Sequence, residues 1–236
     1  MVSHFELRTR SKPCRRLIAA AAVVAQMAVG GSSLAQTGSA PTASQTPLMD
    51  REKEIALALS ACPPALAPGA GVYVLEKNGY VKVRDSKNGF TALVQHAIPA
   101  SQDPQCMDAE GTRTILPRYL KVAELRAEGK SPEEIKQFVA DAFAKGIFQV
   151  PARIGIDYML STQNLTPNAK GEVVPFPPHV MLYAPFLTNA DIGVGKELGV
   201  DGNPMGPAFV ASEGTPTALI IVPVAPAGGH VHPVNP

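Results

Sequence analysis

Two Asn-Gly pairs between short apolar runs constrain the fold of this chain more than any other feature. Asn-Gly supplies the two positive φ angles of a type I′ turn, the tight turn that joins neighbouring antiparallel strands. The sequence therefore predicts a three-stranded meander with turns at Asn78-Gly79 and Asn88-Gly89. Its strands are the runs Gly71–Lys77, Tyr80–Asp85 and Phe90–Gln95.

Two-residue turns also set the register of this meander. Val74 is expected opposite Val83, and Val83 opposite Val94, on a face that belongs to the core. The other face is expected to be covered only in part, and it carries Leu75, Lys82 and Gln95.

Helix signals lie before and after the meander. Asp50 is a good N-cap for a helix that two prolines end, and Pro117 and Gly129 bracket a second helix. Ser131-Pro132-Glu133-Glu134 forms a capping box for a third helix, which Gly146 closes. Further strands are predicted at Ile147–Val150, Ile154–Leu160, His179–Tyr183 and Thr217–Val222.

The order of these elements indicates the fold class. A helix, a meander, a helix pair and then separated strands are typical of an α+β fold. We predict a mixed or mainly antiparallel sheet of five to seven strands with helices on one face. The polar segment Gln163–Pro178 is expected to be a loop, and Thr217–Val222, which lacks alternation, a central strand buried on both faces.

The N-terminus has the layout of a cleaved secretory signal peptide. Five cations between Arg8 and Arg16 precede the 13-residue apolar run Leu17–Val29, and Ser33-Leu34-Ala35 follows with small residues at the cleavage positions. The apolar run is too short to span a bilayer. We therefore expect a periplasmic or secreted protein, cleaved near Ala35 and without a membrane span.

Composition divides the chain into four parts. Residues 1–35 are the expected signal peptide, 36–47 a flexible linker, 48–224 a single globular α+β domain, and 225–236 a disordered Gly/Pro/His tail. Without the signal peptide the chain is mildly acidic and has no basic stripe, which argues against nucleic acid as a partner.

Cysteine usage suggests a covalent link. Cys14 falls within the signal peptide, which leaves Cys62 and Cys106 in a compartment that permits disulfides. A bond between them would close a loop of about 45 residues, worth roughly 4 kcal/mol in the chain-entropy model. Two buried free thiols, or a pair of metal ligands, are the alternatives.

Familiar catalytic motifs are missing from the sequence: it has no Gly-x-Ser-x-Gly elbow, no Walker loop and no His-Glu-x-x-His. His179, at the start of an apolar strand, is the first candidate for a binding role, together with Tyr183, Asn189 and Asp191. Polar residues at strand ends and in the loops that follow often build pockets. The alternative is that His179 caps the strand end, and that Asn189 or Asp191 caps a helical turn.

A second candidate site follows Cys106. Asp108 and Glu110 would lie on one side of an extended segment, and with His96 they could form an acid/base or cation site. Their alternative role is as solvated loop charges or helix caps. His230 and His232 are candidate metal ligands on the C-terminal tail. The alternative is that this tail is disordered and has no role.

Four segments resemble an uncharacterised family of exported bacterial proteins, and the resemblance extends over most of residues 50–224. They are VYVLEKNGYVKVRDSKNGFTALV, CMDAEG, GKSPEE and PPHVMLYAPFLTNADIG. The resemblance implies no activity, cofactor or catalytic residue.

Three classes of function remain open. The first is a binding or accessory domain with its site near His179, whose partner is an unknown small molecule or an envelope protein. The alternative is a hydrolase-like enzyme that uses His179 or His96 with Asp108, Glu110 or Asp191. The third is a structural protein of the envelope, and no cofactor is identified for any of them.

Overall fold

The computed structural model describes residues 46–168, 170–194 and 208–224. The expected signal peptide, all but the last two residues of the expected linker, and the tail with His230 and His232 lie outside the described residues. Within them, none of the helices is long and apolar enough to cross a membrane.

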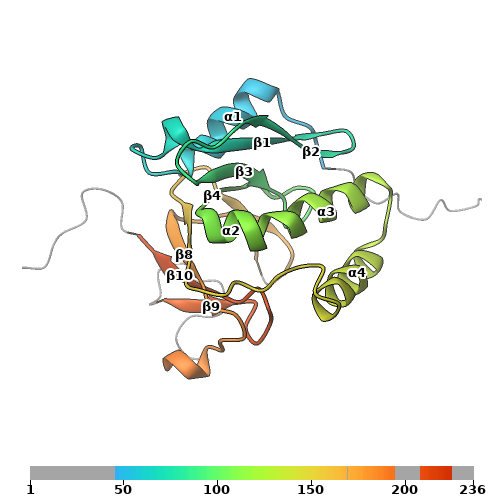
Figure 1. Ribbon diagram of the computed structural model, residues 1–236, viewed down its shortest axis with the longest axis vertical. Helices are drawn as coiled ribbons and strands as arrows, with labels where there is room; N and C mark the ends of the chain where they lie inside the picture. The colour runs from blue at the N-terminus through green and yellow to red at the C-terminus, as the bar shows by residue number, and fades with distance from the viewer. Residues whose placement is uncertain (1–45, 169, 195–207, 225–236) are drawn as a thin grey trace, which may run out of the picture. The chain divides into compact units, whose positions relative to one another are not determined.

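The described residues form an α+β fold around a mixed eight-stranded sheet (Figure 1). The strand order is β2-β1-β3-β4-β5-β8-β10-β9, and β6 and β7 form a separate two-stranded sheet. The class is the predicted one, but the main sheet is larger than the five to seven strands expected. The strands are β1 (Gly71–Glu76), β2 (Gly79–Arg84), β3 (Thr91–Gln95), β4 (Asp103–Met107), β5 (Ile156–Met159), β6 (Leu165–Pro167), β7 (Val173–Pro175), β8 (His179–Tyr183), β9 (Phe209–Ala211) and β10 (Leu219–Pro223).

Helices pack on both faces of the sheet, not on one as predicted. On one face, α1 covers a cluster that includes Val72, Val94 and Cys106. On the opposite face, Leu93 and Met107 pack with residues of α3 and with Ile115, the residue just before that helix. The face expected to be covered only in part is therefore also core. The helices are α1 (Arg51–Ser60), α2 (Ala109–Thr114), α3 (Leu116–Ala127) and α4 (Pro132–Ala144), with short 3₁₀ turns at Ala67–Gly69 and Ala190–Ile192.

The helix starts follow the predicted capping chemistry. The Asp50 side chain accepts a hydrogen bond from the Lys53 N–H at the start of α1. Ser131 and Glu134 form the reciprocal capping box of α4. Capping depends on residues three positions apart, so it can be read from sequence alone.

The predicted meander is wrong. β1 and β2 do form a hairpin, but β3 pairs with β1 in parallel on its other edge. Val74 lies opposite Val81 instead of Val83, and Val94 lies opposite Pro104. Neither turn is of type I′, because in each Asn-Gly pair only the glycine has a positive φ angle.

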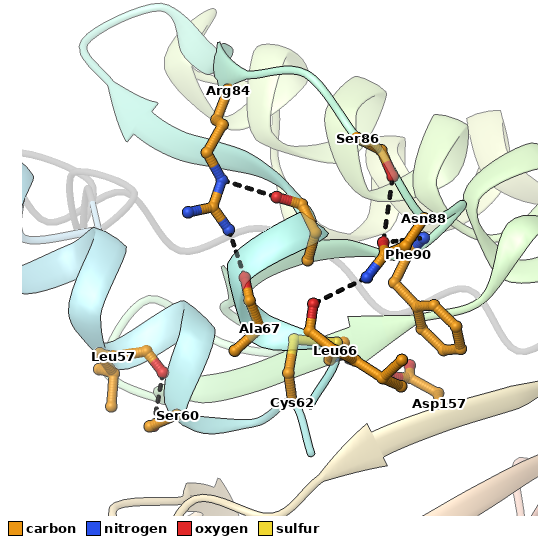
Figure 2. The surroundings of a disulfide bond; sticks show 12 residues. Leu57, Ser60, Cys62, Leu66, Ala67, Arg84, Ser86, Asn88, Phe90 and Asp157 are labelled. Carbon is orange, nitrogen blue, oxygen red and sulfur yellow. Dashed lines mark hydrogen bonds between the residues drawn. A yellow bond between two sulfur atoms is a disulfide. The ribbon is translucent and has the colours of Figure 1, made fainter. Parts of the chain in front are cut away.

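The side chain of Asn88 explains why the second Asn-Gly pair does not make a hairpin. Asn88 donates to the Leu66 carbonyl at 2.8 Å and fastens the segment between β2 and β3 across the end of β1 (Figure 2). Arg84 supports this crossing by donating to the Ala67 and Ala70 carbonyls, each at 2.7 Å. These long-range contacts hold the segment across the end of β1, so that β3 begins on the other edge of β1 and runs parallel to it.

The predicted disulfide is confirmed. Cys62, just beyond the end of α1, bonds to Cys106 on β4, with 5.1 Å between the two Cα atoms. Both residues are buried in the cluster beneath α1, and Figure 2 shows the surroundings of the bond. The bond ties the first helix to an inner strand of the sheet.

Other segments depart from the sequence-based prediction. Ile147–Val150 forms no strand, whereas Gln163–Pro178 contains the β6–β7 hairpin. β10 lies inside the sheet, but Ile221 is buried while Ile220 and Val222 are only half-buried, so it is not covered on both faces.

Candidate functional site

A cavity of about 1000 Å³ lies over the sheet face that packs against α3. Its floor is formed by side chains of β3, β4, β5, β8, β9 and β10. Its walls are formed by α3, α4, strand β6 and the ends of β1 and β2 that meet at their turn. We call it the sheet-face cavity. Its volume is at the upper end of the range found for small-molecule sites.

Strand β4 places two polar side chains on the cavity floor. Successive residues of a strand point to opposite faces, so Asp103 and Gln105 line the cavity while Cys106 points to α1. Asp103 and Gln105 are each only 4% exposed. Neither residue is among those predicted from the sequence, because the β4 segment is not predicted as a strand.

These two side chains hold buried oxygen atoms without partners. Among the described residues, neither Oδ1 of Asp103 nor Oε1 of Gln105 has a hydrogen-bond partner. The other Asp103 oxygen accepts from the Ser101 hydroxyl at 2.9 Å. Burial raises the pKa of Asp103 to about 6. Unpaired buried acceptors are costly, so a bound molecule that offers hydrogen-bond donors would be stabilised here.

Apolar side chains make another part of the floor. Met159, Met181 and Ile221 form a buried cluster on this face. Four half-buried side chains pack against it and also line the cavity, namely Phe176, Phe209, Ala211 and Leu219. A mostly apolar lining with a few convergent polar groups is typical of ligand sites.

His179 lines the cavity and is also built into the fold. It is 3% exposed, and its Nδ1 lies 2.9 Å from the Pro177 carbonyl oxygen. A carbonyl oxygen only accepts, so Nδ1 carries the proton and Nε2 keeps its lone pair. Burial lowers the pKa of His179, which favours this neutral ring. The edge of the ring packs against Phe176, with 4.8 Å between centroids.

His96 lies in a similar environment at another part of the lining. Its Nδ1 contacts the Ser101 carbonyl oxygen, and burial lowers its pKa. Its own carbonyl oxygen accepts from Arg126 at 2.5 Å. In the part of the chain that the structure describes, neither His96 nor His179 forms an ion pair with a carboxylate.

The carboxylates predicted beside Cys106 do not lie on an extended segment, which corrects that expectation. Asp108 is the N-cap of α2 and accepts from the Gly111 N–H at 2.9 Å. Glu110 lies in the first turn of α2, where it pairs with Arg113 at 2.6 Å and Arg153 at 3.4 Å. Neither carboxylate lines the sheet-face cavity.

The other three candidates for a binding role, Tyr183, Asn189 and Asp191, are not among the residues that line the sheet-face cavity. Tyr183 is buried against Gly111, where an added Cβ atom would lie 1.9 Å from the tyrosine hydroxyl. Asn189 accepts from the Val210 N–H at 2.8 Å and donates to its carbonyl at 3.0 Å. Asp191 accepts from the Thr188 N–H at 2.9 Å. The hydrolase-like alternative stays a prediction.

The described residues contain no group of three or more His, Cys, Asp or Glu side chains arranged to hold a metal ion. The candidate ligands His230 and His232 lie outside those residues. No protein-family model, curated protein or solved structure matches this chain.

Proposed function

We propose that this chain is an exported binding domain that holds a small, largely apolar molecule in the sheet-face cavity. The observation that carries the proposal is the pairing of a cavity of about 1000 Å³ with the unpartnered oxygens of Asp103 and Gln105 on its floor. The apolar cluster around Met181 supplies area for hydrophobic contact, and the polar side chains of Asp103 and Gln105 orient the bound molecule.

Export is supported by two independent features. The basic head and apolar run that end at Ala35 have the layout of a signal peptide. The Cys62–Cys106 disulfide fits an oxidising compartment such as the periplasm or the medium. Intact-mass analysis of the exported protein should find cleavage near Ala35, and retention of residues 1–35 would contradict the proposal.

The binding proposal is tested with an uncharged dye, N-phenyl-1-naphthylamine, which fluoresces in apolar surroundings. The wild-type protein should bind it saturably. Ala123→Trp, on the cavity wall formed by α3, should weaken binding because the indole occupies part of the cavity. Ala140→Trp, at an exposed position of α4 outside the lining, is the matched control. Equal dye binding by the two folded variants would refute the cavity as the site.

A further inference from the structure

Arg118 is a cation in the lining of the sheet-face cavity whose charge no carboxylate neutralises among the described residues. It lies on α3, is half-buried, and lines the cavity. Its Nε atom is buried without a hydrogen-bond partner among the described residues. None of the ion pairs within the described ranges includes it. The guanidinium lies over the ring of Tyr119, with 4.8 Å between Cζ and the ring centroid, which holds the group in place without removing its charge.

A second arginine lies on the same face of the helix. Residues four apart are neighbours on a helix, so Arg118, Val122 and Arg126 form one stripe, and all three line the cavity. Arg126 donates to the carbonyl oxygens of His96 and Ala97, which are neutral, so its charge is also not cancelled. Burial lowers the pKa of Arg126, and the nearby charge of Arg118 lowers it further.

Negative charge does not balance these arginines. The acidic residues of the lining are Glu76 and Asp103. Glu76 pairs with Arg51 at 3.3 Å, outside the lining. Asp103 is close to half protonated near pH 6, because burial raises its pKa to about 6. Lys136 of α4 adds another cation to the lining. The cavity therefore combines an apolar floor with a net positive wall.

We propose that the molecule held in the sheet-face cavity is an amphipathic anion: a straight-chain carboxylate whose head group pairs with Arg118 and whose hydrocarbon chain contacts Met181 and Ile221. This inference rests on the proposed binding function. A guanidinium presents parallel N–H donors that match the two oxygens of a carboxylate. Near pH 6 and below, the protonated form of Asp103 would donate to the head group, because burial raises the pKa of Asp103 to about 6.

The test measures displacement of N-phenyl-1-naphthylamine by decanoate, decan-1-ol and decyl phosphate at pH 6, where decanoate is ionised and Asp103 is about half protonated. Wild-type protein should bind decanoate more tightly than the uncharged alcohol. Arg118→Gln should weaken decanoate binding at least about tenfold, the loss expected for a charged hydrogen bond, and leave the alcohol unchanged. Arg118→Lys should lie between the two, and Arg153→Gln, an exposed arginine outside the cavity lining, is the matched control.

Each outcome separates the two proposals. If the alcohol and decanoate bind equally well, Arg118→Gln changes neither, and Ala123→Trp blocks both, the binding function stands and the anionic ligand is refuted. If decyl phosphate binds more tightly than decanoate and depends on Arg118, the carboxylate assignment is refuted. If Ala123→Trp does not weaken binding of the dye, the binding function fails first, and this inference fails with it.

Discussion

Asp103 and Gln105 lie two residues apart on β4 and turn their side chains to the same face of the sheet, where each keeps one buried oxygen atom without a partner among the described residues. Two such acceptors on one strand are an unfavourable feature for the stability of the protein alone. Their position on the floor of a large, mostly apolar cavity gives this feature a role in binding, which can be measured against its effect on stability.

Replacement of Gln105 should separate binding from stability. Gln105→Met keeps the length of the side chain but removes the unpartnered acceptor, so the protein without ligand should gain about 1 kcal/mol in unfolding free energy. Dye or decanoate binding should not improve. Urea denaturation provides the measurement, and Gln163→Met, at an exposed loop position, should leave stability within about 0.5 kcal/mol of wild type. A clear loss of stability in Gln105→Met would show that the amide makes a favourable contact.

A buried glutamate on α1 should make stability depend on pH. Glu54 is 2% exposed, accepts from the Leu75 N–H at 2.7 Å, and has a pKa that burial raises to about 7. The folded state therefore holds this proton more tightly than the unfolded state does. The resulting stability is fully present below about pH 4.5 and is lost as pH rises through about 7.

The pH dependence is tested with Glu54→Gln, which keeps an acceptor for the Leu75 N–H. Between pH 5 and pH 8, wild type should lose about 1–3 kcal/mol more unfolding free energy than this variant. Chemical denaturation at both pH values provides the comparison. Glu52→Gln, an exposed change on the same helix, should behave like wild type. Parallel pH profiles for Glu54→Gln and wild type would contradict the prediction.

The disulfide should contribute more stability than any single hydrogen bond in the domain. Replacing both Cys62 and Cys106 with Ala should cost roughly 2–4 kcal/mol of unfolding free energy, because the bond restricts the unfolded chain. Reduction of the wild-type protein should give a loss of similar size in urea denaturation. Peptide mapping under non-reducing conditions should recover the linked pair, and two free thiols in exported protein would rule the bond out.

Local signals in the sequence predicted the parts of the fold that depend on neighbouring residues. The caps at Asp50 and Ser131 involve groups within one helical turn, so their chemistry is visible in the order of residues. The parallel pairing of β1 with β3 depends on Arg84 and Asn88, which reach carbonyls more than a dozen residues away. Nothing in a short window of sequence distinguishes such an Asn-Gly pair from a hairpin turn.

The candidate site was predicted only in part for a related reason. His179 and His96 were named, and both line the cavity. Asp103 and Gln105 were not, because Pro104 lacks an N–H group and proline is rare in the middle of a sheet. The segment therefore does not indicate a strand. Without a strand, nothing in the sequence shows that Asp103 and Gln105 point to the same face of the sheet. The sequence does not show that Arg118 lacks a carboxylate partner among the described residues and lines a cavity, because both facts depend on how α3 packs in the folded chain.

His179 should affect both the fold and the binding site. His179→Ala removes the donor to the Pro177 carbonyl and the contact with Phe176, so unfolding free energy should fall by about 1–3 kcal/mol. His179→Asn places an N–H donor near the position of Nδ1 and should recover part of this loss. Thermal denaturation of both variants beside wild type measures the effect. Dye affinity, expressed per folded molecule, should fall in both variants, because each removes the ring from the lining of the cavity. Unchanged dye affinity in a clearly destabilised His179→Ala protein would make the residue purely structural.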